Sequence, residues 1–334
     1  MTCVLQQWSP RWGLPSLQPA CTTVQAYMRL ANMPFIIEDY NSVTICPSGV
    51  LPTLDTGDLL VGPNAGLNDQ TIDGSEAADA ILAHLRKVKD LDSSLGAKEL
   101  GEMHAFAALV SAKLIPATVY FTFIDPVGYK KHTQGEYAAN MPMPLNYINP
   151  WRWREAMRKK WGALDPKTVV ADAQIVYGAV AAHIGDQEYF CGDRPSSLDA
   201  VLFAHLNYHY HAPVCESDLR PLLQKHPALV RYVERLSEKH FRNAPPRPPP
   251  AIELTREERV EMDQMRDKES KSWREWIWGT KSSVPKPQRT EKEKNFKRRS
   301  QMFMAFMASA VAAYLLISDV VEVYSDDEDE EGDE

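Results

Sequence analysis

From residue 47 to residue 61 the chain reads Pro-Ser-Gly-Val-Leu-Pro-Thr-Leu-Asp-Thr-Gly-Asp-Leu-Leu-Val. Two short apolar runs, at residues 51–54 and 59–61, flank residues 55–58, which are typical of a tight turn. Apolar runs of this length on either side of such a turn predict a β-hairpin. The hairpin places two adjacent strands in the middle of the first 90 residues.

The segments on both sides of this hairpin alternate between strands and helices. Before it, residues 4–8 and 34–37 are apolar runs that predict strands. A helix is expected between those two strands, because apolar residues there recur mostly at spacings of three and four. After the hairpin, a helix is expected over about residues 75–87. The resulting order, β-α-β-β-β-α, resembles that of a thioredoxin-like domain, which we place at residues 1–90.

From residue 97 to residue 243 the pattern is helical throughout, with helices expected over residues 99–114, 168–184, 197–209 and 227–240. Ser196 stands three residues before Asp199. We expect this pair to cap the helix, the hydroxyl on its free amides and the acid at its positive end. An α/β thioredoxin-like N-terminal domain followed by an all-α C-terminal domain resembles the layout of cytosolic glutathione transferases.

Composition and charge exclude several classes of protein. Of 334 residues, 44% are apolar and 25% are charged, as in an ordinary globular chain. Five scattered cysteines without a Cys-x-x-Cys pair fit a reducing compartment. The net charge of −8 argues against a nucleic-acid partner. The N-terminus has no basic region typical of a secretory signal or a transit peptide.

Several motifs within residues 1–243 are specific enough to compare with a known family. The most specific block begins with Phe123, Asp125 and Tyr129 and continues through Tyr137 to Met-Pro-Met-Pro-Leu-Asn at residues 141–146. Further motifs are Trp-Gly-Leu-Pro-Ser at residues 12–16, residues 47–54, His-Leu-Arg-Lys at 84–87, Lys-Leu-Ile-Pro at 113–116, and residues 190–200. Together these motifs resemble the metaxin family, in its metaxin-1-like branch.

The resemblance implies a mitochondrial outer-membrane protein that faces the cytosol. Its place would be in the sorting and assembly machinery that inserts β-barrel proteins. The partners implied are the β-barrel core of that machinery, a second metaxin-like subunit, and β-barrel precursors.

A glutathione transferase needs a donor that lowers the pKa of the thiol, and residues that hold the tripeptide. Ser9 and Ser16 are the candidate donors, although a serine in such a turn is usually a turn residue. Pro52 resembles the cis-proline of thioredoxin folds, whose neighbouring backbone pairs with a peptide; the alternative is a purely structural turn. An acid or amide directly before the serine is missing, because Ser75 follows Gly74. We therefore expect no enzyme, no catalytic residue and no cofactor; the alternative is a membrane-tethered glutathione-dependent transferase.

Histidines and cysteines offer weaker candidates. His205 and His209 share a helix face at the spacing of a metal pair, with His211 beyond them, but no third ligand or catalytic acid follows. The alternative is a polar helix end, and we expect no metal site. Cys191 and Cys215 are either reactive thiols or small core hydrophobes.

Residues 302–317 are a run of sixteen uncharged residues. A helix continued to residue 323 is long enough to cross a hydrocarbon core of about 30 Å. We interpret residues 302–323 as a single transmembrane helix that anchors the chain; the alternative is a helix packed on another protein, in a cytosolic scaffold. The proposed anchor residues are Met302, Phe303, Phe306, Tyr314, Leu315, Leu316 and Ile317.

The regions next to this run differ in charge. Residues 286–300 hold seven basic and two acidic residues, and residues 325–334 hold eight acidic residues and no basic one. Because basic residues stay on the cytosolic side, the folded part should face the cytosol. The acidic tail, residues 324–334, either binds basic precursors or stays solvated.

Residues 244–300 are expected to be a linker, first Pro-rich and then charged, that contains a Trp-rich helix. Trp273, Trp276 and Trp278 lie within six residues. This helix either docks on a membrane interface or a partner, or packs back on the folded domain.

Overall fold

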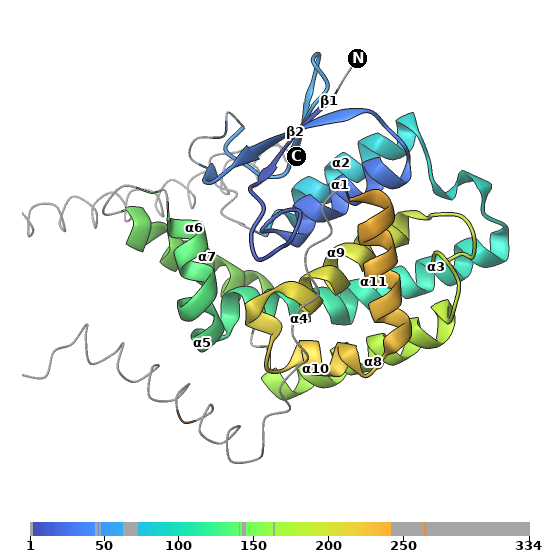
Figure 1. Cartoon of the computed structure of the whole chain (residues 1–334). Helices are drawn as coiled ribbons and strands as arrows, with labels where there is room; N and C mark the ends of the chain where they lie inside the picture. Colours follow the sequence, from blue (N-terminus) through green and yellow to red (C-terminus); the bar gives the residue numbers. More distant parts are fainter. Residues whose placement is uncertain are drawn as a thin grey trace, which may run out of the picture. The chain divides into compact units, whose positions relative to one another are not determined.

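The computed structural model describes residues 3–241, apart from residues 44–45, 47, 63–72, 140, 142–144 and 163, together with residue 264 (Figure 1). The expected transmembrane helix at 302–323, the acidic tail at 324–334 and the residues Trp273, Trp276 and Trp278 lie outside the described residues.

The first part of the chain forms a four-stranded sheet with two helices beside it (Figure 1). Its elements are β1 (Cys3–Trp8), α1 (Pro19–Leu30), β2 (Phe35–Tyr40), β3 (Thr53–Asp55), β4 (Leu60–Val61) and α2 (Ser75–Val88). The strand order is β2-β1-β3-β4, with β1 parallel to β2 and antiparallel to β3. The predicted order of strands and helices is confirmed, and the second strand extends further than expected, to Tyr40.

The second part is helical. Its elements are α3 (Ala97–Leu109), α4 (Ile115–Val119), α5 (Pro126–Gly128), α6 (Gln134–Ala138), α7 (Leu145–Trp161), α8 (Pro166–Ile184), α9 (Ser197–His211), α10 (Leu219–Gln224) and α11 (Pro227–His240). Three π-helical turns, Val110–Leu114, Tyr120–Ile124 and Tyr129–Thr133, continue α3, α4 and α5, and short 3₁₀ turns lie at Asp92–Ser94 and Pro213–Cys215.

One helix among the described residues, Ala97–Ile124, is long and apolar enough to cross a membrane by length and composition. Half of its most apolar window is buried inside the protein. Leu114 and Ala117, at its centre, are fully buried in the main core, and the helix contacts α8 and α9. Packing against these helices accounts for its apolar composition.

Apolar residues form two core clusters. The larger joins α1 to α8, α9 and α11. The smaller lies at the end of β1, and we call it the β1-end cluster. Its buried members are Trp8, Leu17, Cys21, Cys46, Leu51, Val119, Phe123, Tyr129, Tyr137 and Met157.

The start of α9 is held by Asp199, which is fully buried. Its Oδ2 accepts hydrogen bonds from the amide and the hydroxyl of Ser196, at 2.8 and 2.6 Å. Its Oδ1 accepts from the amide of Phe190 at 2.7 Å and from the hydroxyl of Tyr232 at 2.8 Å. Burial raises the pKa of Asp199, and these hydrogen bonds oppose the rise. The Ser196 and Asp199 pair therefore ties the helix start to α11 as well as capping it.

Candidate functional site

The start of α2 lies directly against the Leu51–Pro52 peptide bond, which is cis. Gly74, just before the helix, has a φ of +64°. A Cβ atom there would lie 2.6 Å from the carbonyl oxygen of Leu51 and 2.9 Å from Oε1 of Gln18. Both the left-handed backbone and this close approach require glycine.

Asp73, Ser75 and Glu76 surround this helix start, and we call these three residues the anionic corner. Asp73 is 8% exposed. Its Oδ1 accepts hydrogen bonds from the hydroxyl of Ser75 at 3.0 Å and from its amide at 3.3 Å. No acid or amide stands directly before Ser75, as expected, but Asp73 supplies an acid from one residue further away, because the backbone turns at Gly74.

The end of α7 occupies the anionic corner. The Nζ atom of Lys160 lies 3.3 Å from Oδ2 of Asp73 and donates to Oε1 of Glu76 at 3.0 Å and to Oγ of Ser75 at 3.2 Å. The indole Nε1 of Trp161 donates to Oδ2 of Asp73 at 3.4 Å. Partial burial disfavours the ammonium, but the two carboxylates outweigh it and raise the pKa of Lys160. The corner therefore already holds a positive charge, supplied by the chain itself.

Aromatic rings fill the space at the end of β1. The rings of Trp8 and Tyr137 meet edge to face with their centroids 4.8 Å apart, and Phe123 lies 5.6 Å from Tyr137. Each of the three side chains is at most 5% exposed. In the described part of the chain, side chains from the helical part thus cover the end of this strand.

Tyr137 belongs to residues 125–161, and we call the described residues of this range the closing segment. The carboxylate of Asp125 accepts a hydrogen bond from the amide of Gly128 at 2.7 Å and starts α5. The hydroxyl of Tyr129 donates to the carbonyl of Pro150 at 2.5 Å, which ties the middle of α7 to the segment before it. The guanidinium of Arg154 lies over the ring of Tyr129, 5.1 Å from its centroid.

The residues of the most specific sequence block therefore have structural roles in the closing segment. Asp125 caps a helix, Tyr129 binds α7, and Tyr137 packs on the end of β1. Sequence reasoning identified the block but missed α7 and the contact of Lys160 with Asp73. The basic residues before Trp161 are visible in the sequence, but they predict a contact with Asp73 only when the position of Asp73 in the fold is known.

The candidate thiol-activating serines have other roles. The hydroxyl of Ser16, which is 1% exposed, donates to the carbonyl of Trp8 at 2.8 Å. Ser9 is half-buried, and its amide donates to the carbonyl of Tyr40 at 2.9 Å. The nearby thiol of Cys21 is fully buried, and burial raises its pKa to about 12. This thiol is neutral at physiological pH.

His205 and His209 belong to a buried polar network, so the expectation of a polar helix end is wrong for these two. The hydroxyl of Thr118 lies 2.8 Å from Nδ1 of His205 and from Nε2 of His209. Nδ1 of His209 lies 2.7 Å from the hydroxyl of Tyr177. Burial lowers the pKa of His205 to about 4 and that of His209 well below its ordinary value. Both rings are therefore neutral at pH 7.

One arrangement of protons satisfies this network. If Thr118 donates to the carbonyl of Leu114, 3.2 Å away, it can accept from one N–H of each histidine. The remaining nitrogen of His209 then accepts from Tyr177. In the described residues, no group of three or more His, Cys, Asp or Glu side chains could hold a metal ion.

The remaining candidate side chains are buried or half-buried. Cys215 is fully buried in the main core, and burial raises the pKa of its thiol. Cys191 is half-buried, and burial raises its pKa to about 11. Burial, together with the positive charge of Arg220 and opposed by the negative charge of Glu234, lowers the pKa of His211 to about 4. The two thiols are protonated at neutral pH, which is the behaviour of packing residues.

Comparison with known proteins identifies the family. A family model described as an outer mitochondrial membrane transport complex protein matches residues 21–154, and a glutathione S-transferase C-terminal domain matches residues 173–236. Metaxin-1 of Bos taurus is 30% identical over 270 residues, which cover 75% of this chain and 80% of that protein. The chain belongs to the metaxin family. Similar metaxins include metaxin-1 of Mus musculus, 29% identical over 70% of this chain and 74% of that protein. Metaxin-3 of Xenopus laevis is 28% identical over 71% of this chain and 76% of that protein.

Solved structures similar to this metaxin include a glutathione transferase and a β-etherase. A glutathione transferase from Phanerochaete chrysosporium has a TM-score of 0.46 and 11% identity, over 72% of this chain and 98% of that one. A β-etherase from Sphingobium has a TM-score of 0.43 and 15% identity, over 72% of this chain and 96% of that one. The mixed sheet followed by helices gives the metaxin a glutathione-transferase-like fold.

Family membership indicates the mitochondrial outer membrane as the site of this metaxin, and a subunit of a transport complex as its role. The resemblance seen in the sequence motifs is confirmed.

Proposed function

We propose that the chain is a non-enzymatic subunit of the outer-membrane sorting and assembly machinery that aids import and insertion of β-barrel precursors. The position of Lys160 is the observation that supports the absence of enzymatic activity in this proposal. An acid and a serine at a helix start could hold the amino group of a γ-glutamyl peptide, but here the chain's own ammonium binds both. The aromatic packing of Tyr137 on Trp8 adds support, because it covers the end of β1.

The partners of this subunit are, in the same proposal, the β-barrel core of the machinery, a second metaxin-like subunit and β-barrel precursors. Membership of the metaxin family supports a place among such subunits. An anchor at residues 302–323, with basic residues before it and acidic residues after it, would hold the folded part on the cytosolic side.

Depletion of the protein followed by import of a radiolabelled β-barrel precursor into isolated mitochondria tests the transport role. Assembly of the precursor into its mature membrane complex should slow, while import of a matrix-targeted precursor serves as the control. Normal assembly kinetics of the β-barrel would contradict the proposal.

Titration of the full-length protein with glutathione tests the alternative, a membrane-tethered transferase. A ligand that binds the native state raises the melting temperature, by an amount that grows with its concentration. We expect no shift for the wild type. A clear, saturable shift in the wild type would favour the transferase, and a shift in Lys160→Ala but not in Lys159→Ala would show that Lys160 blocks the corner.

A further inference from the structure

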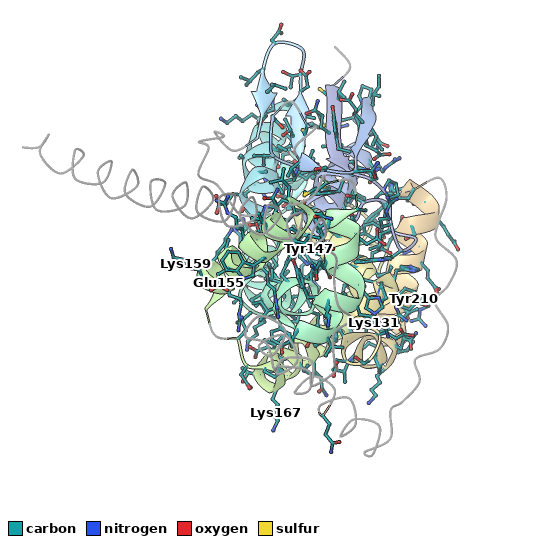
Figure 2. All side chains as sticks on the ribbon, turned by 90° about the vertical axis from the view of Figure 1, so that its left-hand side faces the viewer. Lys131, Tyr147, Glu155, Lys159, Lys167 and Tyr210 are labelled. Carbon is teal, nitrogen blue, oxygen red and sulfur yellow. The ribbon has the colours of Figure 1, made fainter. Side chains whose placement is uncertain are left out.

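The face of α7 that points away from the core is not covered by other described residues. Pro150 and Met157, on the inner face, are buried. Tyr147, Trp151 and Glu155 follow one another at a spacing of four and therefore share the opposite face. Figure 2 shows this end of the molecule, with Tyr147 in the middle of the view and Glu155 and Lys159 at its left edge.

The first half of this outer face is apolar and aromatic. Tyr147 is 64% exposed, Trp151 51% and Leu145 40%. These three belong to a single helix, whereas large exposed apolar residues elsewhere in the described chain are scattered over several elements. Tyrosine and tryptophan that expose both an apolar ring and a polar atom are typical of a surface between water and lipid.

Basic side chains follow the aromatic ones on the outer face. Arg152, Arg158 and Lys159 stand beside a single acid, Glu155. None of these three cations forms an ion pair with another residue that the structure describes. Their neighbours on α7 differ: Arg154 donates to the carbonyls of the Tyr120–Ile124 turn, and Lys160 binds the anionic corner. The helix therefore separates cations that hold the fold together from cations that face outward.

We propose that this outer face of α7 lies on the surface of the outer membrane and binds anionic phospholipid headgroups. Exposed aromatic rings beside unpaired cations on one helix face are the pattern of a helix that lies in a membrane interface. The charge of the face is complementary to an anionic leaflet. The proposal uses the outer-membrane location of the family and does not depend on which precursor the complex handles.

The contact would fix the orientation of the folded part relative to the membrane. If the proposed anchor at residues 302–323 holds the chain at the membrane, a face of low intrinsic affinity suffices for binding, since tethering raises its local concentration there. Lys160 joins the end of α7 to Glu76 at the start of α2, so the membrane would orient the sheet part as well.

The test places full-length protein in phosphatidylcholine vesicles, with and without phosphatidylinositol, and measures quenching of tryptophan fluorescence by brominated lipid. The difference between the wild type and Trp151→Phe reports on Trp151 alone. Quenching of Trp151 should appear with phosphatidylinositol and decrease as salt is added.

Matched variants separate this face from the rest of the surface. Each cation near an anionic surface contributes about fivefold to affinity, so Arg158→Glu with Lys159→Glu should lose at least about tenfold and, with it, the quenching of Trp151. Lys167→Glu with Lys225→Glu makes the same change of charge at exposed positions on α8 and after α10, and should leave the quenching unchanged. Unchanged melting temperatures show that each pair of variants remains folded.

Three results would overturn the proposal. One is a Trp151 that stays accessible to iodide and unquenched by lipid in all vesicles. Another is protection that appears in neutral vesicles and vanishes when residues 325–334 are deleted, since this would assign the face to the acidic tail. The third is protection that appears only when another subunit of the complex is added, which would assign the face to a protein. Because these readings need no precursor, they are independent of the import assay.

Discussion

Two of the contacts between the sheet part and the helical part, within the described residues, differ in chemistry. Where α1 packs along α9, Val24, Met28 and Leu206 are fully buried in the main core. Where the closing segment meets the start of α2 and the loop after β1, charged and aromatic side chains make the contact, among them Lys160 and Arg11. The first contact belongs to the larger core cluster. The second covers the start of α2 and the end of β1 with side chains of the helical part.

The largest expected effect separates these two contacts. Leu206→Ala should lower the free energy of unfolding by about 2–5 kcal/mol, because it leaves a cavity in the shared core. Urea unfolding of the full-length protein in mild detergent measures this loss. Ile175→Ala, at a residue of α8 that is 55% exposed, is the control and should change stability by less than about 0.5 kcal/mol. Equal losses in both variants would mean that the packing of α1 on α9 is not the main stabilising contact between the sheet part and the helical part.

Acid should weaken the α9 side of the molecule through His205. The pKa of His205 is lowered by burial to about 4, whereas an unfolded histidine titrates near 6.5. The unfolded chain therefore binds more protons between these values, and stability falls as the pH is lowered through this window. The loss for His205 is on the order of 2 kcal/mol from about pH 7 to about pH 5.

Unfolding curves at the two pH values, for the wild type and His205→Gln, measure this effect. The slope with pH should be smaller in His205→Gln and unchanged in His104→Gln, which alters an exposed residue of α3. A pH dependence that is the same in all three proteins would argue against the neutral, buried state of His205.

Loss of the charge in the anionic corner should have a moderate effect. Lys160→Met leaves Asp73 buried without its cation, and should cost about 1–2 kcal/mol in the same unfolding assay. Lys159→Met removes the neighbouring exposed cation and should stay within about 0.5 kcal/mol. If the two variants are equally stable, the corner is held by Trp161 and the β1-end cluster rather than by charge.

The pair between Arg11 and Glu136 should contribute less. Its atoms are 2.9 Å apart, but both side chains are about one third exposed. Arg11→Gln should therefore cost about 0.2–1 kcal/mol, and the difference from the wild type should shrink at high salt. A loss of stability as large as that of Lys160→Met would mean that Glu136 on α6, rather than Lys160 on α7, makes the main polar contact of the closing segment.

The smallest effect is expected for the hydroxyl of Tyr137. This group is buried and has no hydrogen-bond partner among the described residues. Tyr137→Phe should leave stability unchanged or raise it by up to about 1 kcal/mol, because no hydrogen bond is lost. Tyr137→Ala, which removes the packing on Trp8, should cost about 3–5 kcal/mol and is the comparison. A large loss in Tyr137→Phe would indicate that the hydroxyl binds an ordered water.

Local patterns were sufficient to predict most of the fold. Helix α11 has the expected bounds, Pro227–His240, because its apolar spacing and its first-turn proline agree. Helix α7 could not be predicted in this way, since Pro150 interrupts it and its long side chains follow no clear apolar period. Its position depends on contacts with residues far away in sequence, such as the bond of Tyr129 to Pro150.

The candidate site could be predicted only in part. The motif around Asp125 and Tyr129 marked the closing segment without showing what it closes. The spacing of His205 and His209 was correctly placed on one helix, but their burial depends on Thr118 and Tyr177 from other helices. Asp73 was overlooked because the expected pattern puts the acid next to the serine, whereas the turn at Gly74 separates them.

The closing segment follows, in the sequence, the residues that it covers, and this has a consequence for biosynthesis. Trp8, Leu17 and Leu51 leave the ribosome early, but Tyr137 and Met157, which cover them, follow only after most of the first helices have been made. During that interval the nascent chain exposes an apolar surface beside a strand edge, the kind of surface that chaperones recognise and that aggregates when unprotected. Translation pauses or chaperone supply between residues 90 and 161 would therefore influence how much of this protein matures.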